Sequence, residues 1–324
     1  MSKDIISIVV PCHNEEEMVP IFHKEIAAVS GQLPDTLFEL IFVNDGSKDD
    51  TLAKMKQVAA LDERVHYLSF SRNFGKEAAL VAGLRHATGD YVAVMDADLQ
   101  DPPALLVEMV ALIRTGEYDC IGTKRIDRKG EPPIRSFFAR QFYQLINRIS
   151  DTEIVDGARD FRLMTRQMVD AVLEMTEYNR FSKGIFSWVG FETKYLSYEN
   201  QERVAGQTTW SFWSLFKYSL DGIVAFSEAP LAIAALTGVL SFAVAILGAL
   251  VLVVRTLAFG NETSGWTSLI VIILGMGGLQ LLCLGILGKY LGKTFMETKR
   301  RPLYILKETD PALPTNRRKG QLDV

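Results

Sequence analysis

The sequence contains few cysteines and histidines and no excess of basic residues. Its 324 residues include three cysteines and four histidines, and its formal net charge is −4. Cys12, Cys120 and Cys283 lie far apart without metal-ligand spacing, which predicts free thiols in a reducing compartment. The mildly acidic balance gives no reason to expect a nucleic-acid partner. The N-terminal residues lack a cleavage site of small residues, so we expect no signal peptide.

Charged residues are also absent from two long segments in the last third of the chain. Residues 229–254 and 263–288 are each roughly 26 residues long, and about 20 apolar residues are enough to cross the hydrocarbon core of a bilayer. Both are rich in Leu, Ile, Val, Ala and Gly, and neither has a polar face. We therefore predict transmembrane helices at 229–255 and 265–289. A buried helical hairpin of a soluble protein is the alternative.

Basic residues follow the second predicted span, whereas the loop between the spans carries only Arg255 and Glu262. The positive-inside rule then places both chain ends in the cytosol and the short loop outside. The expected location is the inner (plasma) membrane as a multi-pass protein, with residues 290–324 as a cytosolic basic tail. The composition of this tail predicts disorder from about Glu308. The basic residues after the second span are Lys289, Lys293, Lys299, Arg300 and Arg301.

Two further segments combine aromatic and aliphatic residues with basic ones. Residues 134–150 and 211–228 both have the composition of amphipathic helices that lie on a membrane surface. For the first segment, packing on a sheet or on a partner subunit is the alternative. We predict that both segments are interfacial helices, the second of them next to the membrane hairpin.

Residues 1–210 alternate short apolar runs with helical patterns, which predicts βαβ units and a mostly parallel, Rossmann-like sheet in a cytosolic α/β domain. In such sheets ligands bind at the carboxyl ends of the strands. The loops at 11–15, 44–47, 71–76 and 96–100 all follow predicted strands and should gather along one edge. The predicted strands are 5–10, 38–43, 65–70, 91–95 and 118–123, and the predicted helices are 13–30, 51–61, 77–87, 105–114 and 165–175.

Two carboxylates, Asp96 and Asp98, stand directly after one of these strands. In extended backbone, positions i and i+2 face the same way, so the two could share one cation, and Gln100 continues the alternation. Mg²⁺ or Mn²⁺ held by one or two carboxylates and substrate phosphates is the usual arrangement for these ions. The alternative is an acidic turn in which Asp101 caps the next helix.

Polar residues gather in three more loops. The basic, glycine-containing segment 124–130 suits contact with phosphates, or is a solvated surface loop. Residues 156–162 form a dense polar cluster before a predicted helix. Residues 201–210 form a second polar cluster that has neither strand nor helix periodicity.

Several of these motifs, in this order, resemble those of family 2 glycosyltransferases with the GT-A fold. More closely, the chain from residue 5 to about residue 300 resembles the polyprenyl-phosphate hexose transferases. That group includes dolichol-phosphate mannose synthases and bacterial bactoprenol-phosphate glucosyltransferases. The segments that carry the resemblance are Pro11-Cys12-His13-Asn14-Glu15-Glu16, Val43-Asn44-Asp45-Gly46-Ser47, Asp96-Ala97-Asp98-Leu99-Gln100-Asp101-Pro102 and Asp160-Phe161-Arg162.

The resemblance implies roles for the matching residues. Asp96, Asp98 and Gln100 would hold the metal on the donor diphosphate, and Arg203 would close over that diphosphate. Asp160 stands where related enzymes have a proposed catalytic carboxylate, so the implied catalytic residues are Asp160, Asp98 and Arg203. Acceptor phosphate would be contacted by Arg125 and Arg135. The implied donor-binding residues are Pro11, His13, Glu15, Asp45, Lys76, Asp96, Ala97, Asp98, Gln100, Arg125 and Arg203.

The implied reaction is transfer of a hexose from a nucleotide-diphosphate sugar, UDP-glucose in the bacterial branch, to undecaprenyl phosphate. One displacement would invert the anomeric carbon, and the product would serve cell-envelope glycan modification. The acceptor phosphate, with a second pKa near ~6, is already largely ionised at neutral pH, so Asp160 is a base or an orienting group. The resemblance also suggests a homo-oligomer, such as a tetramer.

Other functions stay open at this point. The chain lacks the Gln-x-x-Arg-Trp motif of processive synthases and has only two predicted spans, which argues against polymerisation. Transfer of GlcNAc, galactose or mannose, or transfer to another lipid, fits the same motifs. A non-catalytic membrane protein that binds nucleotide sugars is the alternative from a different class.

Overall fold

The computed structural model describes residues 3–125, 144, 147–149, 155, 157–199, 223–259 and 265–313. Within these residues the α/β part is built on an eight-stranded sheet of order β7-β5-β6-β4-β1-β2-β3-β8. Six of these strands run in one direction, and only β6 and β8 oppose them. The strands are β1 Asp4–Cys12, β2 Thr36–Asn44, β3 Val65–Phe70, β4 Tyr91–Val94, β5 Cys120–Arg125, β6 Ala158–Thr165, β7 Thr193–Tyr198 and β8 Leu306–Thr309.

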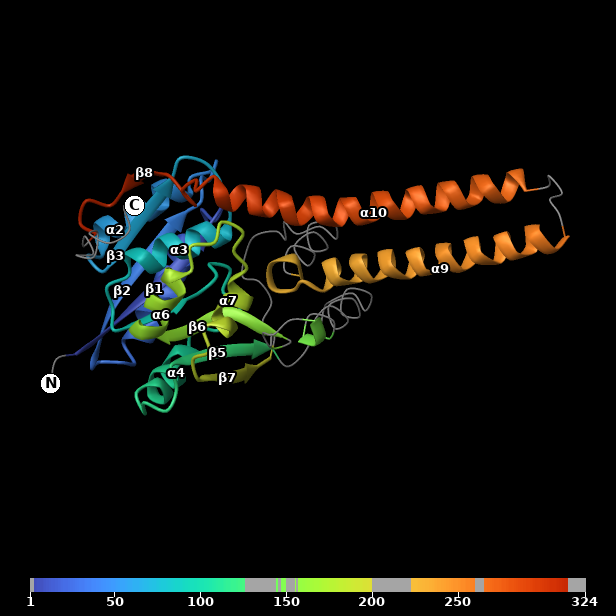
Figure 1. Cartoon of the computed structure of the whole chain (residues 1–324). Coiled ribbons are helices and arrows are strands. Elements are labelled where there is room, and N and C mark those ends of the chain that lie inside the picture. Colours follow the sequence, from blue (N-terminus) through green and yellow to red (C-terminus); the bar gives the residue numbers. More distant parts are fainter. Residues whose placement is uncertain are drawn as a thin grey trace.

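Helices cover both faces of this sheet (Figure 1). On one face α1 (Met18–Ser30), α2 (Thr51–Leu61) and α4 (Leu105–Ile113) bury apolar side chains against the strands. On the other face lie α3 (Lys76–His86), α6 (Arg166–Glu174) and α7 (Ser182–Trp188). Because the central strands are covered on both sides, they read as continuous apolar runs in the sequence.

Helix α3 lies unusually close to the central strand β1. A Cβ atom at Gly83 would come within 2.1 Å of Val9 Cγ1, so only glycine fits there. This close approach brings the first residue of α3, Lys76, to the carboxyl edge of the sheet, where the strand-end loops meet. The six parallel strands and the helices on both faces confirm the predicted, mostly parallel α/β fold.

Several element boundaries differ from the predicted ones. Helix α2 and strand β3 have the predicted limits, but α1 begins at Met18 and not at His13. The loop before α1 instead packs against the start of α2, because the backbone N–H of Glu15 donates to Thr51 Oγ1 at 2.8 Å. The polar cluster at 156–162 is largely strand β6, which the sequence analysis missed.

Residues 308–313 are ordered, so the predicted disorder from Glu308 is wrong for them. Strand β8 pairs with β3 in antiparallel register. The ring of Tyr304 stacks on Phe70 with centroids 5.0 Å apart, and Asp310 Oδ2 lies 3.0 Å from His66 Nδ1 in a buried pair. This segment therefore returns to the sheet and closes one edge of it.

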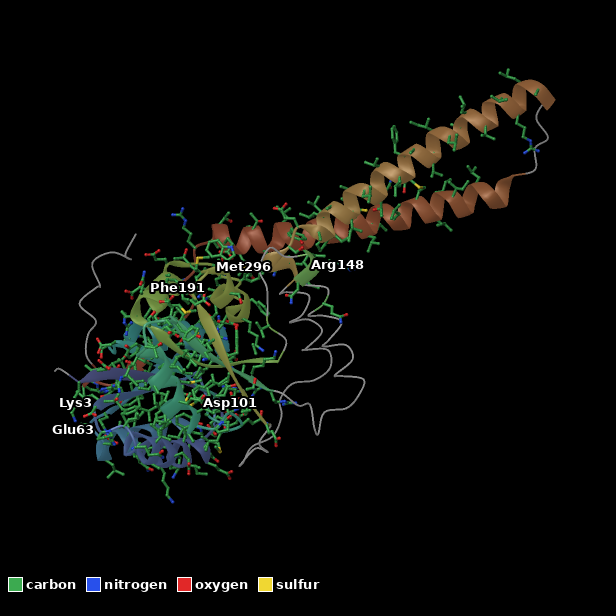
Figure 2. All side chains as sticks on the ribbon, turned by 90° about the horizontal axis from the view of Figure 1, so that it is seen from below. Lys3, Glu63, Asp101, Arg148, Phe191 and Met296 are labelled. Atoms are coloured by element: carbon green, nitrogen blue, oxygen red, sulfur yellow. The ribbon has the colours of Figure 1, made fainter. Side chains whose placement is uncertain are left out.

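Two long helices, α9 (Ala229–Phe259) and α10 (Trp266–Thr298), run alongside each other away from the α/β domain (Figures 1 and 2). Large apolar side chains such as Leu236, Phe242 and Leu282 are more than half exposed on them. The stretches Ala229–Val251 and Ile272–Thr298 are long and apolar enough to cross a membrane. Such exposed apolar surface suggests association with a membrane.

The predicted interfacial segments fall mainly outside the described residues. Of 134–150, residues 144 and 147–149 are described and are helical, and of 211–228, residues 223–226 are helical. The domain limits and the interfacial placement of both segments therefore stay predictions.

The buried pair of Asp310 and His66 makes the C-terminal segment part of the fold. We expect Asp310→Ala to leave His66 without its buried partner and to cost about 1–3 kcal/mol of stability. Thermal unfolding of the full chain in detergent should show a midpoint lowered by about 2–4 °C for each kcal/mol lost. Lys307→Ala, on the exposed side of β8, is the control and should leave the midpoint unchanged. Equal midpoints for Asp310→Ala and wild type would show that this edge adds nothing to stability.

Candidate active site

The carboxylate of Asp45 joins the loop after β2 to the loop after β3. It accepts hydrogen bonds from the backbone N–H groups of Phe74, at 2.6 Å, and Gly75, at 2.9 Å. Its own N–H donates to Cys12 O at the end of β1, and His13 Nδ1 lies 2.9 Å from its carbonyl oxygen. Burial raises the pKa of Asp45, although the two N–H groups oppose the rise. Three strand-end loops thus meet around one buried side chain.

The loop after β1 packs against the loop after β2. Asn14, with a positive φ of 57°, donates its N–H to Ser47 Oγ at 2.9 Å. The structure therefore brings Pro11, His13 and Glu15 to the edge where Asp45 lies, as predicted for a donor-binding group. Their contacts with a nucleotide stay predictions.

The ammonium group of Lys76 lies between two carboxylates from different strands. Its Nζ is 2.6 Å from Asp96 Oδ1, after β4, and it also donates to Asp160 Oδ2, on β6. Burial alone would lower the pKa of Lys76, but the charges of Asp160 and Asp96 outweigh it and raise that pKa. Lys76 thus holds together two acids that would otherwise repel each other.

Asp160 is the more enclosed of the two acids, with 18% of its side chain exposed against 26% for Asp96. Burial opposes its ionisation, yet the positive charges of Lys76 and Lys183 hold the pKa of Asp160 well below its ordinary value. Lys183, in α7, donates from Nζ to Ala158 O at 3.2 Å, which holds its ammonium beside strand β6, where Asp160 lies. A carboxylate held in this way is a weak proton acceptor and a strong partner for cations.

The segment from Asp96 to Asp98 is not extended. Ala97 and Asp98 form a turn, and Leu99 has a φ of 53°. The predicted i, i+2 arrangement in extended backbone is therefore wrong for this pair, because strand β4 ends at Val94. Asp98 is nevertheless buried next to the strand end, and its Oδ1 accepts from the N–H of Gln100 at 3.2 Å.

The residues present suit a divalent cation that is completed by substrate oxygens. Among the described residues no three His, Cys, Asp or Glu side chains converge as a metal cage. Two carboxylates plus donor phosphates is a normal set for Mg²⁺ or Mn²⁺, and the Lys76 ammonium shows that Asp96 attracts a cation. Gln100 is the weaker candidate ligand, because its Oε1 already accepts from Arg159 Nη2 at 3.3 Å.

Arg159 anchors the loop that carries these acids, and the sequence analysis did not single it out. Its Nε donates to Asp101 Oδ1 at 3.0 Å, and Tyr198 OH on β7 donates to the same oxygen. Burial raises the pKa of Asp101, and Arg159 opposes this rise. The alternative in which Asp101 caps α4 is wrong, because the N-cap of that helix is Ala104.

The predicted phosphate-binding arginines are described only in part. Arg125 ends β5 and is half-buried, with its N–H donating to Gly157 O at 3.1 Å. Arg135 and Arg203 lie outside the described residues. Their roles therefore stay predictions.

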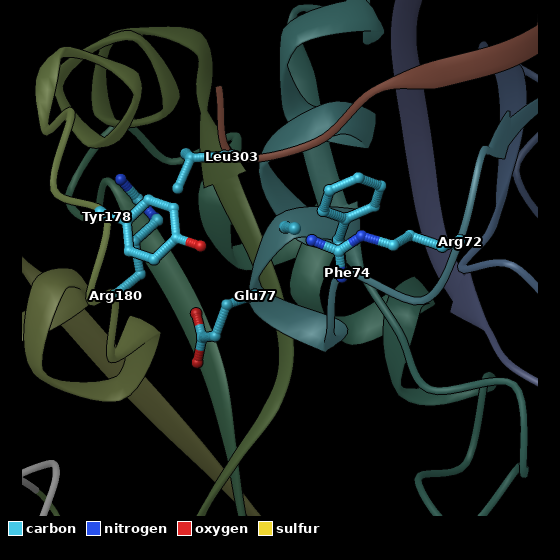
Figure 3. Close-up of a pocket in the computed structure, with 7 residues that line it drawn as sticks. Arg72, Phe74, Glu77, Tyr178, Arg180 and Leu303 are labelled. Atoms are coloured by element: carbon cyan, nitrogen blue, oxygen red, sulfur yellow. The ribbon is translucent and has the colours of Figure 1, made fainter. Parts of the chain in front are cut away.

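A pocket of about 120 Å³ is lined by Glu77 and Ala78 of α3 (Figure 3). In that view Arg72 and Phe74 lie on one side of the pocket, and Tyr178 and Arg180 lie on the other. Glu77 accepts from the backbone N–H and the hydroxyl of Ser182, and burial raises its pKa. The contact with Ser182 ties the first turn of α3 to α7.

The family model described as Glycosyl transferase family 2 matches residues 7–173, which include every acid of this site. The chain belongs to glycosyl transferase family 2. It is 43% identical over 310 residues to the putative glycosyltransferase CsbB of Bacillus subtilis (strain 168), covering 96% of this chain and 93% of that protein. It is also 43% identical over 302 residues to the prophage bactoprenol glucosyl transferase homolog of Escherichia coli (strain K12), covering 93% and 98%.

A distant structural likeness accompanies these relatives. The crystal structure of glucosyl-3-phosphoglycerate synthase from Mycobacterium tuberculosis with phosphoglyceric acid is 20% identical, with a TM-score of 0.44 over 68% of this chain and 78% of that one. The family model and the two relatives, and not this distant likeness, show that the chain is a glycosyltransferase, as predicted.

The ammonium of Lys76 must leave Asp96 before a metal ion can bind to the same oxygen. We therefore expect Lys76→Met to raise the affinity for Mn²⁺ in the absence of donor by about tenfold. Electron paramagnetic resonance of free Mn²⁺, titrated with the full chain, measures this directly. Lys183→Met is the matched control and should change the affinity far less, because Lys183 donates to a backbone carbonyl instead. Unchanged Mn²⁺ affinity in Lys76→Met would place the ion away from Asp96.

Proposed function

We propose that this family 2 glycosyltransferase moves glucose from UDP-glucose to a polyprenyl phosphate at the cytosolic face of the membrane, with inversion at the anomeric carbon. The observation that carries the proposal is a cluster of carboxylates at the carboxyl edge of a parallel sheet, in a domain from which two long apolar helices emerge. The relative named as a bactoprenol glucosyl transferase homolog, matched over nearly its whole length, supports the lipid acceptor and the sugar.

The carboxyl edge faces the lipid side of the molecule in this proposal. Figure 1 draws the arrow of β5 pointing toward the side from which α9 and α10 extend. All six parallel strands share that direction, so their end loops lie on the same side. A soluble donor can therefore bind within reach of an acceptor that stays in the bilayer.

In the proposed mechanism Asp96 and Asp98 hold Mg²⁺ or Mn²⁺ against the donor diphosphate, with Gln100 as a weaker candidate. The ion would supply Lewis-acid stabilisation of the departing diphosphate. Lys76 keeps its proton, because its pKa is raised, and so remains a positive charge next to the same phosphates. Arg203, Arg125 and Arg135 are proposed to add further positive charge around donor and acceptor.

Asp160 acts in this proposal as an orienting group and not as the base. Its pKa is lowered by Lys76 and Lys183, so it is a poor proton acceptor. The acceptor phosphate needs no base, because its second pKa near ~6 leaves it ionised at neutral pH. The remaining difficulty is to bring two anions together, which fixed positive charges accomplish.

The proposed membrane placement has two crossings, with both chain ends in the cytosol. The basic residues at the domain end of α10 and the short loop between α9 and α10 support it. Assembly into a homo-oligomer stays a prediction.

We expect Asp98→Asn to lower turnover by at least about 10³-fold, because the amide keeps the shape of the side chain and removes its charge from the metal. The assay follows radiolabelled glucose from UDP-glucose into an organic-extractable, acid-labile product with undecaprenyl phosphate. Asp35→Asn, at an exposed position, is the matched control and should keep the full rate. Metal-dependent nucleotide binding by the wild type without any product would instead support a non-catalytic binding protein.

The role of Asp160 gives a separate test in the pH profile. We expect wild-type kcat/KM to rise with pH through about 6, as the acceptor phosphate ionises. Asp160→Asn should lower the rate about 10²-fold or more and leave that rising limb in place, because the titrating group is on the acceptor. Rates measured from pH 5 to 8 decide between the roles. Loss of the limb in Asp160→Asn would make Asp160 the base.

A further inference from the structure

A groove of about 590 Å³ lies where the apolar hairpin joins the α/β domain. It is lined by the loop after α6, by residues 224–225 before α9, and by the end of α10 nearest the domain. Figure 2 marks this end of α10 with the label of Met296. None of the residues that line the groove belongs to the cluster around Lys76, so the groove is a separate site.

The groove lies at the depth expected for lipid headgroups if α10 crosses the membrane as proposed. The uncharged part of α10 runs from Trp266 to Gly288, which at 1.5 Å per residue is roughly 34 Å, close to the ~30 Å hydrocarbon core. The lining residues of α10 begin just after it, at Tyr290, and reach Arg300. On the other wall, Val224 and Ala225 precede the first residues of α9 by only a few positions.

The lining residues of α10 follow one face of the helix. Tyr290, Lys293, Thr294 and Glu297 recur at spacings of three and four, which places their side chains in one row. The hydroxyl of Tyr290 donates to Ser227 O at 2.6 Å, which ties this face of α10 to the residues that precede α9. The groove is therefore formed by the junction of hairpin and domain, and polar side chains of α10 line it in one row.

The lining carries both signs of charge. Lys293 and Arg300 are positive, and Glu177 and Glu297 are negative. Glu297 is already engaged, because the backbone N–H groups of Tyr178 and Asn179 donate to it at 3.0 and 3.1 Å. Glu177 is different. It lines the groove, and among the described residues its carboxylate forms no hydrogen bond or salt bridge, so its side chain can meet a cation that enters the groove.

The backbone of Arg300 supplies an independent observation. Its φ is 47°, in the left-handed region that costs a non-glycine residue about 1–2 kcal/mol. Glycine is the usual residue at such a position after a helix end. Arg300 lines the groove, so a positively charged residue stands at a position where glycine would be less strained.

We propose that this groove binds the headgroup of phosphatidylethanolamine, with the lipid phosphate on Arg300 and Lys293 and the ammonium on Glu177. The inference rests on the proposed membrane placement and is independent of the transferase reaction. A headgroup with both charges matches a lining with both charges. Phosphatidylglycerol has no cation for Glu177, and the trimethylated amine of phosphatidylcholine has no N–H to donate to its carboxylate.

Native mass spectrometry of the full chain in maltoside micelles, titrated with each of the three phospholipids, tests the proposal. We expect phosphatidylethanolamine to bind most tightly. Arg300→Gly and Arg300→Asn should weaken both phosphatidylethanolamine and phosphatidylglycerol by about tenfold, through loss of a charge-assisted hydrogen bond. Glu177→Gln should weaken phosphatidylethanolamine by about fivefold or more and leave phosphatidylglycerol unchanged.

Two controls keep the result interpretable. Arg301→Ala removes the same charge from the adjacent exposed residue, which does not line the groove, and should change binding less than twofold. The thermal midpoint of Arg300→Gly should equal or exceed that of wild type, because glycine adopts positive φ without strain. A loss of binding in that variant then reports the missing side chain and not misfolding.

Equal binding of phosphatidylglycerol and phosphatidylethanolamine, or no effect of Glu177→Gln, would overturn the proposal. So would displacement of the phospholipid by undecaprenyl phosphate together with a tenfold higher acceptor KM in Arg300→Gly, because the groove would then belong to the acceptor. If wild type binds phosphatidylethanolamine selectively and yet forms no glycosylated lipid, the proposed function fails and the lipid site stands.

Discussion

The contact of one ammonium group with two carboxylates organises the edge of the sheet. Asp96 and Asp160 come from strands β4 and β6, and Lys76 reaches both from the first residue of α3. The position of Lys76 depends in turn on Asp45, which holds the two preceding backbone N–H groups. One chain of polar contacts therefore links the region proposed to bind the nucleotide with the acids proposed to handle the diphosphate and the sugar. In the proposed function a donor that brings its own charge rearranges this contact, which would couple donor binding to activation at Lys76.

A second cluster keeps the acidic loop in place when the first one rearranges. Arg159 holds Asp101 and the side chain of Gln100, and Tyr198 adds a bond from β7. None of these four residues forms a hydrogen bond with Lys76, although the charge of Asp96 acts on Arg159 as well as on Lys76. In the proposed function a metal ion replaces the Lys76 ammonium at Asp96, while Asp101 keeps its contacts with Arg159 and Tyr198.

The parallel sheet and the place of its acidic edge were predictable, because buried parallel strands are continuous apolar runs and their end loops share one side. Strand β6 was not predictable, because its polar residues interrupt the alternation of apolar and polar side chains that marks a strand. Phe161 and Leu163 are fully buried, but Arg162 between them is buried too and stacks on Phe186 at 3.8 Å. Strand β8 is four residues long and follows a charged segment, so only its tertiary pairing with β3 defines it. Lys76 lay in a predicted loop, but its salt bridges depend on the close packing of α3 on β1, which spacing alone does not reveal.

The attachment of the hairpin to the domain has a consequence for the proposed reaction. Just before α9, the carbonyl oxygen of Ser227 accepts a hydrogen bond from Tyr290 of α10. Near the end of α10, Glu297 accepts hydrogen bonds from backbone N–H groups of the loop after α6. Beyond α10, Tyr304 stacks on the sheet at Phe70. The contacts of Glu297 and Tyr304 thus join the hairpin end to the catalytic domain, and the contact of Tyr290 with Ser227 joins α10 to the chain that enters α9. A polyprenyl phosphate cannot leave the bilayer to find its partner, so the enzyme must hold the donor at a constant height above the membrane. A single flexible linker would give no such constraint, whereas these contacts make the depth of the active site a property of the fold.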